Sequence, residues 1–278
     1  MTGVQTCALP ISEYKGGERE LFTKLVRDGF ARFADNKTVS GARELERAAA
    51  LAKENAPLNI FLGEHFFGEA RMSLARDYLS RALEVQTENT RLRLLLGIAA
   101  GDEGDAGRAR ELLYDAVNRG GPSFAAHCAL GRLAAAEGNW AAAVEEFKRA
   151  LAARPCPEAH YLLGFANYRL NRDRTAQRYL KKAVKLDANY VEAFHLLSFV
   201  QRRLGEDEQA EQSLKTARAL NEGEPCDVEE GEHEDVAEAV EPSLFGPKGR
   251  RGPKLMTGGD ARLATALRDD ALGYVAPR

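Results

Sequence analysis

Cysteine and histidine are the residues of this sequence that could bind a metal or carry redox chemistry, and their spacing supports neither role. The four cysteines, Cys7, Cys128, Cys156 and Cys226, include no C-x-x-C pair of the kind found in zinc ribbons and redox motifs. Isolated cysteines are typical of thiols in a reducing compartment. We therefore expect no metal, no cofactor and a cytoplasmic location.

Two histidines and one acidic loop are the remaining candidates for a metal site. His127 and His160 stand at equivalent places of the repeated pattern described below, and we interpret both as packing residues. Residues 101–105, GDEGD, lack the ordered ligand spacing and closing glutamate of a calcium loop. Phosphate-binding, serine-hydrolase and zinc-protease motifs do not occur. We therefore predict that the chain is not an enzyme.

The composition excludes several other classes of protein. Of the 278 residues, 44% are hydrophobic and 29% are charged, which is typical of a globular chain. No apolar run approaches the roughly 18 residues of a membrane span. The formal net charge of −3 gives no overall bias toward nucleic acid. We expect neither a membrane span nor a nucleic-acid partner.

Small residues recur along the chain with a period of 34 or 33 residues, which indicates repeated supersecondary units. The first column is Gly29, Gly63, Gly97, Gly131, Gly164 and Ser198. The second column follows twelve residues later and is Gly41, Ala75, Ala109, Ala143, Ala176 and Ala210. The third column is Ala48, Ala82, Ala116, Ala150, Ala183 and Ala217. Between the last two columns lies a large apolar residue: Leu45, Leu79, Leu113, Phe147, Leu180 or Leu214.

This phasing predicts units of two antiparallel helices. We expect the first and second columns to face each other, so that the helices of a pair approach closely. The third column would pack the second helix against the next unit. Gly104, Gly138, Asn171 and Gly205 lie where the first helix must stop, and glycine or asparagine accepts the left-handed conformation needed there.

The best copy of the pattern, residues 157–190, resembles the tetratricopeptide repeat. It carries Leu163-Gly164, Tyr168, Ala176, Leu180, Ala183 and Leu186-Asp187 in the positions of that family, but His160 and Ala188 depart from it. The resemblance implies an all-α, right-handed superhelical solenoid of antiparallel helix pairs. The five good copies are 56–89, 90–123, 124–156, 157–190 and 191–222. A degenerate copy at 22–55, with Asp28 and Gly41 at core positions, is expected to cap the N-terminal end.

The resemblance also implies a function, since the first helices of this family line a concave groove that binds peptides. The groove positions of the central repeats hold Ile60, Phe67, Arg91, Leu94, Ile98 and Arg132. Those of the later repeats hold Tyr161, Phe165, Tyr168, Arg169, His195, Phe199, Arg202 and Arg203. Acidic members are Glu64, Asp102, Glu158 and Glu192. The competing interpretation is that some apolar members, Phe165 and Phe199 especially, only close gaps between helices.

We therefore expect a protein–protein interaction scaffold that binds an extended or helical partner peptide. Tyr161, Tyr168 and Phe199 would anchor it. The side chains that would select acidic or phosphate-bearing groups are Arg132, Arg169, Arg202 and Arg203. An alternative is that the chain is the regulatory or assembly half of a larger protein. That protein would be a kinase, a transcription factor or a secretion or cell-envelope component, with its N-terminal part missing here.

The two ends of the chain differ from the repeats. Residues 2–11, TGVQTCALPI, resemble a translated sequencing adapter, so we interpret 1–12 as non-native and 13–21 as a lead-in. Residues 222–241 hold ten acids and no Lys or Arg, and a basic Gly/Pro stretch follows them. We expect a disordered linker over 223–259, a short helix over 260–274 and a tail over 275–278. The short helix either stays free or docks on the open end of the last repeat. The acidic segment 224–241 could occupy the groove and compete with partners.

Overall fold

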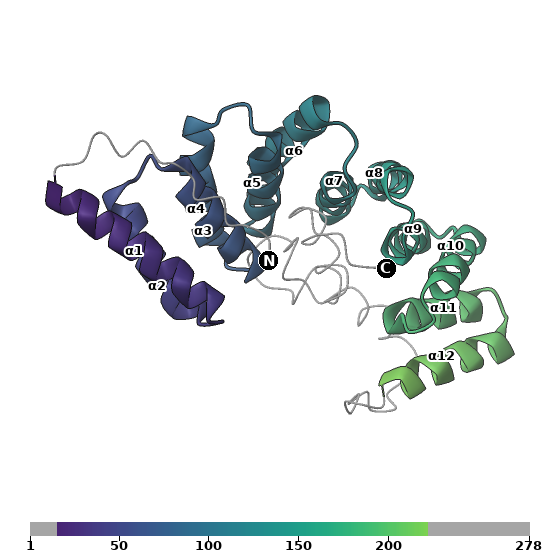
Figure 1. Cartoon of the computed structure of the whole chain (residues 1–278). Coiled ribbons are helices and arrows are strands. Elements are labelled where there is room, and N and C mark those ends of the chain that lie inside the picture. The colour runs from purple at the N-terminus through teal and green to yellow at the C-terminus, as the bar shows by residue number, and fades with distance from the viewer. Residues whose placement is uncertain (1–15, 222–278) are drawn as a thin grey trace. The chain divides into compact units, whose positions relative to one another are not determined.

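The structure is a computed structural model that describes residues 16–221. Twelve α-helices and no strand occur over these residues (Figure 1). They are α1 (Gly16–Ala34), α2 (Thr38–Leu51), α3 (Ala56–Gly68), α4 (Met72–Val85), α5 (Thr90–Asp102), α6 (Ala106–Gly120), α7 (Phe124–Ala136), α8 (Trp140–Ala153), α9 (Pro157–Arg169), α10 (Asp173–Leu186), α11 (Val191–Arg203) and α12 (Asp207–Asn221). The all-α prediction is confirmed.

Odd-numbered and even-numbered helices form pairs, as the repeat predicted. Three residues join the two helices of every pair, and so short a link makes them antiparallel. α1 packs along α2, α3 along α4, α7 along α8, α9 along α10 and α11 along α12. From α3 onward, the first helix of each pair begins at the residue where the corresponding repeat was predicted to begin. In the N-terminal pair, α1 begins at Gly16, ahead of the predicted start of that repeat at residue 22.

The described chain divides into two compact units whose boundary lies within α5, after Leu96. The first unit, residues 16–96, holds α1 to α4 and the first half of α5. The second unit, residues 97–221, holds the rest of α5 and α6 to α12.

The turn inside each helix pair has one residue with positive φ. The predicted turn residues Gly104, Gly138, Asn171 and Gly205 have φ of 90°, 77°, 57° and 77°. Asn36 and Ala70 take the same place in the first two pairs, with φ of 62° and 57°. The left-handed conformation expected from the sequence is therefore present in every pair, including at an alanine.

The first column of small residues lets a large side chain of the second helix reach the backbone of the first. A Cβ atom added at Gly63 would lie 2.6 Å from Leu79 Cδ2, and one at Gly131 would lie 2.3 Å from Phe147 Cε1. The first and second columns face each other as expected, since a Cβ atom added at Gly29 would lie 3.2 Å from the Gly41 carbonyl oxygen, but the nearest atoms belong to the large apolar residue. The large apolar residue four positions later fills most of the contact, because its side chain is long enough to cross between the helices.

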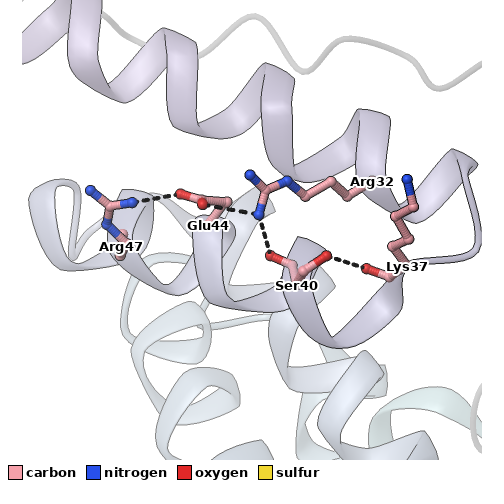
Figure 2. A network of polar contacts seen from close by, with 5 residues as sticks. All are labelled: Arg32, Lys37, Ser40, Glu44 and Arg47. Carbon is pink, nitrogen blue, oxygen red and sulfur yellow. Dashed lines mark hydrogen bonds and ion pairs between the residues drawn. The ribbon is translucent and has the colours of Figure 1, made fainter.

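The N-terminal pair adds a polar network at its surface. Glu44 of α2 bridges two arginines: its Oε1 lies 3.1 Å from Arg32 Nη1, and its Oε2 lies 2.8 Å from Arg47 Nη1 (Figure 2). The Ser40 hydroxyl donates to the carbonyl oxygen of Lys37 at 3.1 Å. Since Arg32 belongs to α1, the network ties the two helices of this pair together.

Candidate functional site

The predicted groove residues of the second unit lie on one side of each first helix. Tyr161, Phe165, Tyr168 and Arg169 are spaced four, three and one residues apart along α9, which places them on one face. The set on α11, His195, Phe199, Arg202 and Arg203, has the same spacing. Arg132 occupies the matching place on α7. We call these nine residues the first-helix face.

An aromatic and arginine cluster joins α9 to the start of α8. The rings of Phe165 and Trp140 meet edge to face, with centroids 5.6 Å apart. The Arg169 guanidinium carbon lies 4.5 Å from the Trp140 ring centroid, which is a cation–π distance. Burial lowers the pKa of Arg169, but the group keeps its charge at any physiological pH. The tryptophan thus holds Arg169 beside the aromatic part of the face.

A second cluster joins α9 to α11. The Arg203 guanidinium carbon lies 4.7 Å from the centroid of the Tyr168 ring. Its Nη2 donates to Asn171 Oδ1 at 2.7 Å and lies 3.2 Å from Asp173 Oδ2. One arginine at the end of α11 therefore stacks on α9 and pairs with the turn that leads into α10.

Exposure increases along the face toward α11. Arg132, Tyr161 and Phe165 are each only 1% exposed, and Tyr168 is also buried. Arg169, His195 and Phe199 are half-buried, whereas Arg202 and Arg203 are exposed. The α11 part of the face is thus its accessible part in this structure.

His195 lies in a setting that favours its neutral form. Burial lowers the pKa of His195, and the positive charge of Arg218 on α12 lowers it further. At neutral pH the imidazole therefore offers one N–H donor and one ring-nitrogen acceptor. It contributes hydrogen bonding to the face without adding to its charge.

The remaining predicted groove residues lie outside α7, α9 and α11. In the first unit, Ile60 and Leu94 are half-buried and Phe67 is fully buried. Arg91 is exposed and lies 3.0 Å from Glu64. Burial raises the pKa of Glu64, and Arg91 opposes that rise. Ile98, in the second unit on α5, is fully buried.

Several contacting residues were not predicted from the sequence. Trp140, Asn171 and Asp173 complete the two clusters of the second unit, but they lie in a second helix or a turn, and only first-helix positions were considered. Trp140 is the only tryptophan of the chain, which was the available signal. In the first unit, the ring of Phe61 lies edge to face with those of Phe30 and Phe33, at centroid distances of 4.9 and 5.0 Å.

The two candidate metal-binding histidines have other partners. His127 Nδ1 lies 2.9 Å from Glu146 Oε2 in the buried contact between α7 and α8, and Glu146 Oε1 accepts from Arg149 at 2.6 Å. His160 Nδ1 lies 2.9 Å from the backbone oxygen of Cys156. Over residues 16–221, no group of three or more His, Cys, Asp or Glu side chains could hold a metal ion. The histidines thus have structural partners within their own helix pairs.

Five predictions concern residues outside the described range: the adapter-like residues 1–12, the acidic segment 224–241, the linker 223–259, the helix 260–274 and the tail 275–278. Residues 16–221 contain no helix with the length and hydropathy that a membrane crossing requires.

Comparison with known proteins identifies the repeat. Residues 157–190 match the family model described as "Tetratricopeptide repeat". The comparison with curated proteins gave no match. Solved structures share the fold at low sequence identity. A crystal structure of MamA protein is 20% identical with a TM-score of 0.52, and the match covers 60% of this chain and 92% of that chain.

Two further solved structures agree with this assignment. MamA 41-end from Desulfovibrio magneticus RS-1 is 20% identical with a TM-score of 0.55, over 61% of this chain and 96% of that chain. The APC/C hetero-tetramer Cut9-Hcn1 is 17% identical with a TM-score of 0.59, over 79% of this chain but only 42% of that chain. Residues 157–190 are thus matched as a tetratricopeptide repeat, and the helix pairs described above share the fold of these solved structures.

Proposed function

We propose that the chain is a protein–protein interaction scaffold whose first-helix face binds an extended or helical peptide of a partner protein. The observation that carries this proposal is the alignment of aromatic and arginine side chains along α9 and α11. Such side chains are the usual anchors of protein interfaces. The family supports the proposal as well, because its members are interaction scaffolds and are generally not enzymes.

The accessible part of the face suggests how the peptide is held. Phe199 is half-buried and offers an apolar surface, whereas Tyr168 and Tyr161 are buried and support that surface from within the packed helices. Arg202 is exposed and makes no ion pair with a described residue. A free guanidinium of this kind forms strong, paired hydrogen bonds with carboxylate or phosphate groups. We therefore propose an acidic or phosphate-bearing peptide as the partner.

Arg132, Arg169 and Arg203 have different roles in this proposal. Arg132 is buried, Arg169 lies over Trp140, and Arg203 is engaged with Tyr168, Asn171 and Asp173. They hold the aromatic side chains in place and add positive potential beneath the peptide. Arg202 makes the direct contact.

The proposal includes two further contacts. In the first unit, Ile60, Arg91 and Leu94 form a separate candidate peptide contact, and Phe67 is a fully buried groove position. Ile98 is a separate, buried groove position of the second unit. The acidic segment 224–241 is also proposed to contact the repeats within the same chain.

Selection from a peptide library followed by calorimetry tests the main proposal. A phage-displayed library of random peptides is selected against the full chain, and the dissociation constant of the best synthetic peptide is measured. We expect Phe199→Ala and Arg202→Ala each to weaken binding by about tenfold or more, as interface anchors do.

The controls for this experiment lie on α6, a second helix. Tyr114 and Arg108 are an exposed aromatic residue and an exposed arginine away from the first-helix face. Tyr114→Ala and Arg108→Ala should leave the dissociation constant unchanged. Equal losses in both sets of variants, or no selected peptide at all, would contradict the proposal.

A further inference from the structure

The second helix of the best repeat, α10, presents an unusual concentration of positive charge. Five exposed cations of this helix are successively four, three, one and three residues apart. At 3.6 residues per turn, this spacing places them in a stripe on one side of the helix. We call this stripe the basic face; it consists of Arg174, Arg178, Lys181, Lys182 and Lys185. The opposite stripe, Ala176, Leu180 and Ala183, is buried. The basic face therefore points away from the packed side of α10.

No described acid neutralises the basic face. The only acid of α10 is Asp173, and that carboxylate pairs with Arg203 of α11. Two members of the face contact uncharged groups: Lys181 Nζ donates to Gln209 Oε1 at 3.4 Å, and the Arg178 guanidinium lies 5.5 Å from the Tyr179 ring centroid. Five cations thus share one side of a helix with no ion pair to residues 16–221.

The other second helices do not share this imbalance. In α2, α6 and α8, acids spaced three or four residues from the cations pair with them. These pairs are Glu44–Arg47, Arg108–Glu111, Asp115–Arg119, Glu145–Lys148 and Glu146–Arg149. A solvated helix surface in this protein normally carries both signs of charge. The excess of positive charge on α10 therefore favours binding of an anionic partner.

The chain itself carries a matching segment just after the described helices. Residues 224–241 hold nine acids and no Lys or Arg, and α12 ends three residues before them, at Asn221. Fully extended, 18 residues span about 60 Å, whereas α10, with 14 residues, is about 21 Å long. The segment is therefore long enough to follow the whole basic face.

α12, which ends at Asn221 just before this segment, contacts α10 at its own N-terminal end. Lys181 of α10 contacts Gln209 in the first turn of α12, and Gln177 hydrogen-bonds Glu206 one turn earlier. Moving along α10 from Gln177 to Lys181 corresponds to moving forward from Glu206 to Gln209, so α10 and α12 run in the same direction. This is expected of alternate helices in a series whose neighbours are antiparallel. The C-terminal end of α12 thus lies at the same end of the array as Lys182 and Lys185.

We propose that the acidic segment 224–241 docks on the basic face of α10. This inference deepens the intramolecular contact proposed above and rests on it, but it places the contact on a second helix. The first-helix face offers fewer available cations, since Arg132 is buried and Arg203 is already paired with Asp173. Covalent linkage adds a local concentration on the order of millimolar for a short connection, which favours the segment over a separate acidic partner.

Nuclear magnetic resonance of the full chain tests this placement. Backbone amide resonances of residues 224–241 are compared between the unchanged chain and the K181E/K182E/K185E variant at low salt. We expect those resonances to lie away from random-coil positions in the unchanged chain and to move to them in the variant. Raising the salt from about 0.02 M to 0.5 M should have the same effect, because the Debye length falls below about 5 Å.

Two variants keep the test specific. K181Q/K182Q/K185Q removes charge without reversing it and should release the segment in part, and circular dichroism checks that α10 remains helical. The matched control is R108E/R110E, which reverses two arginines of α6 and should leave the segment resonances unmoved. Peptide binding by the first-helix face is measured separately, so each proposal can fail alone.

Three results would overturn the proposal. Random-coil resonances of 224–241 in the unchanged chain would show that the segment contacts nothing. Release by R202E but not by the α10 variants would place it on the first-helix face. Shifts of α10 resonances on addition of a polyglutamate peptide, with the resonances of 224–241 unmoved, would assign the basic face to a separate acidic partner.

Discussion

At the scale of single residues, the turn within each helix pair depends on a backbone conformation that glycine adopts most easily. Gly104, Gly138 and Gly205 supply it in three pairs, and asparagine supplies it in two. Ala70 is the exception, since it holds φ at 57° in the α3–α4 turn with its side chain exposed. A Cβ atom in this region costs on the order of 1 kcal/mol.

Exchanging alanine and glycine at two turns tests this cost. Ala70→Gly should raise the free energy of unfolding by about 0.5–1 kcal/mol, because relief of strain outweighs the greater freedom of the unfolded chain. Gly138→Ala, at φ 77° with open space around it, should lower it by a similar amount. Urea denaturation measures both. Changes of the same sign in the two variants would contradict the account.

Close helix approach depends on the first small column, and Gly131 tests it most severely. Gly131→Ala should destabilise the chain by about 1–3 kcal/mol, because the new Cβ would lie 2.3 Å from the Phe147 ring. The control is Gly107→Ala on α6, where the nearest atom, Asp105 Oδ1, is 3.8 Å away. That control should be neutral or slightly stabilising in the same denaturation measurement. Unchanged stability in Gly131→Ala would show that the helix register is wrong.

The thiol of Cys156 gives a pH-dependent prediction. Burial raises the pKa of Cys156 to about 11, although a hydrogen bond from the Ala159 backbone opposes the rise. Alkylation of Cys156 in the folded chain, followed by peptide mass spectrometry, should therefore accelerate with pH until about 11. The folded pKa exceeds the unfolded pKa of about 8.5. The protonated thiol's contribution to the free energy of unfolding is therefore fully present below about pH 8.5 and is lost as the pH rises from there to about 11. A rate that levels off near pH 9 would contradict the assignment.

At the scale of helices, polar ties join neighbouring elements at their ends. Arg203 links α11 to Tyr168 of α9 and to Asp173 of α10, much as Glu44 links α1 to α2. The planar guanidinium stacks on a ring and pairs with two oxygens at once, which a lysine ammonium cannot do. The contacts of Arg203 should therefore require an arginine side chain and not only a positive charge.

Conservative substitution of adjacent arginines tests this tie. Arg203→Lys should lower the free energy of unfolding by about 0.5–1 kcal/mol, the size of a partly exposed cation–π contact. Arg202→Lys, next to it but without these contacts, should have no measurable effect. Thermal and urea denaturation compare the two. Equal effects in both would show that the contacts of Arg203 add nothing to stability.

At the scale of the whole molecule, sequence periodicity predicted the helix pairs well. The spacing of Gly63, Gly97, Gly131 and Gly164 fixed which helices pair, because only a small residue permits that approach. Turn residues such as Gly138 and Asn171 located the breaks. These features are local or repeat at a fixed distance, so they can be recognised in a single sequence.

The candidate site was harder to predict for a physical reason. Trp140 and Asp173 meet Arg169 and Arg203 only through contacts between helices of different pairs. Such contacts depend on side-chain direction, which the repeat pattern does not specify. The basic face of α10 was visible as a run of Lys and Arg, but its lack of ion pairs needed the structure.

The central claim, that the first-helix face binds a peptide, is tested most directly by mapping the selected library peptide on the full chain. Amide resonance shifts are recorded as the peptide is added to isotope-labelled protein. The account predicts the largest shifts on α9 and α11, around residues 161–169 and 195–203, with loss of those shifts in Phe199→Ala. Shifts confined to the second helices, or no shifts at a saturating peptide concentration, would contradict it.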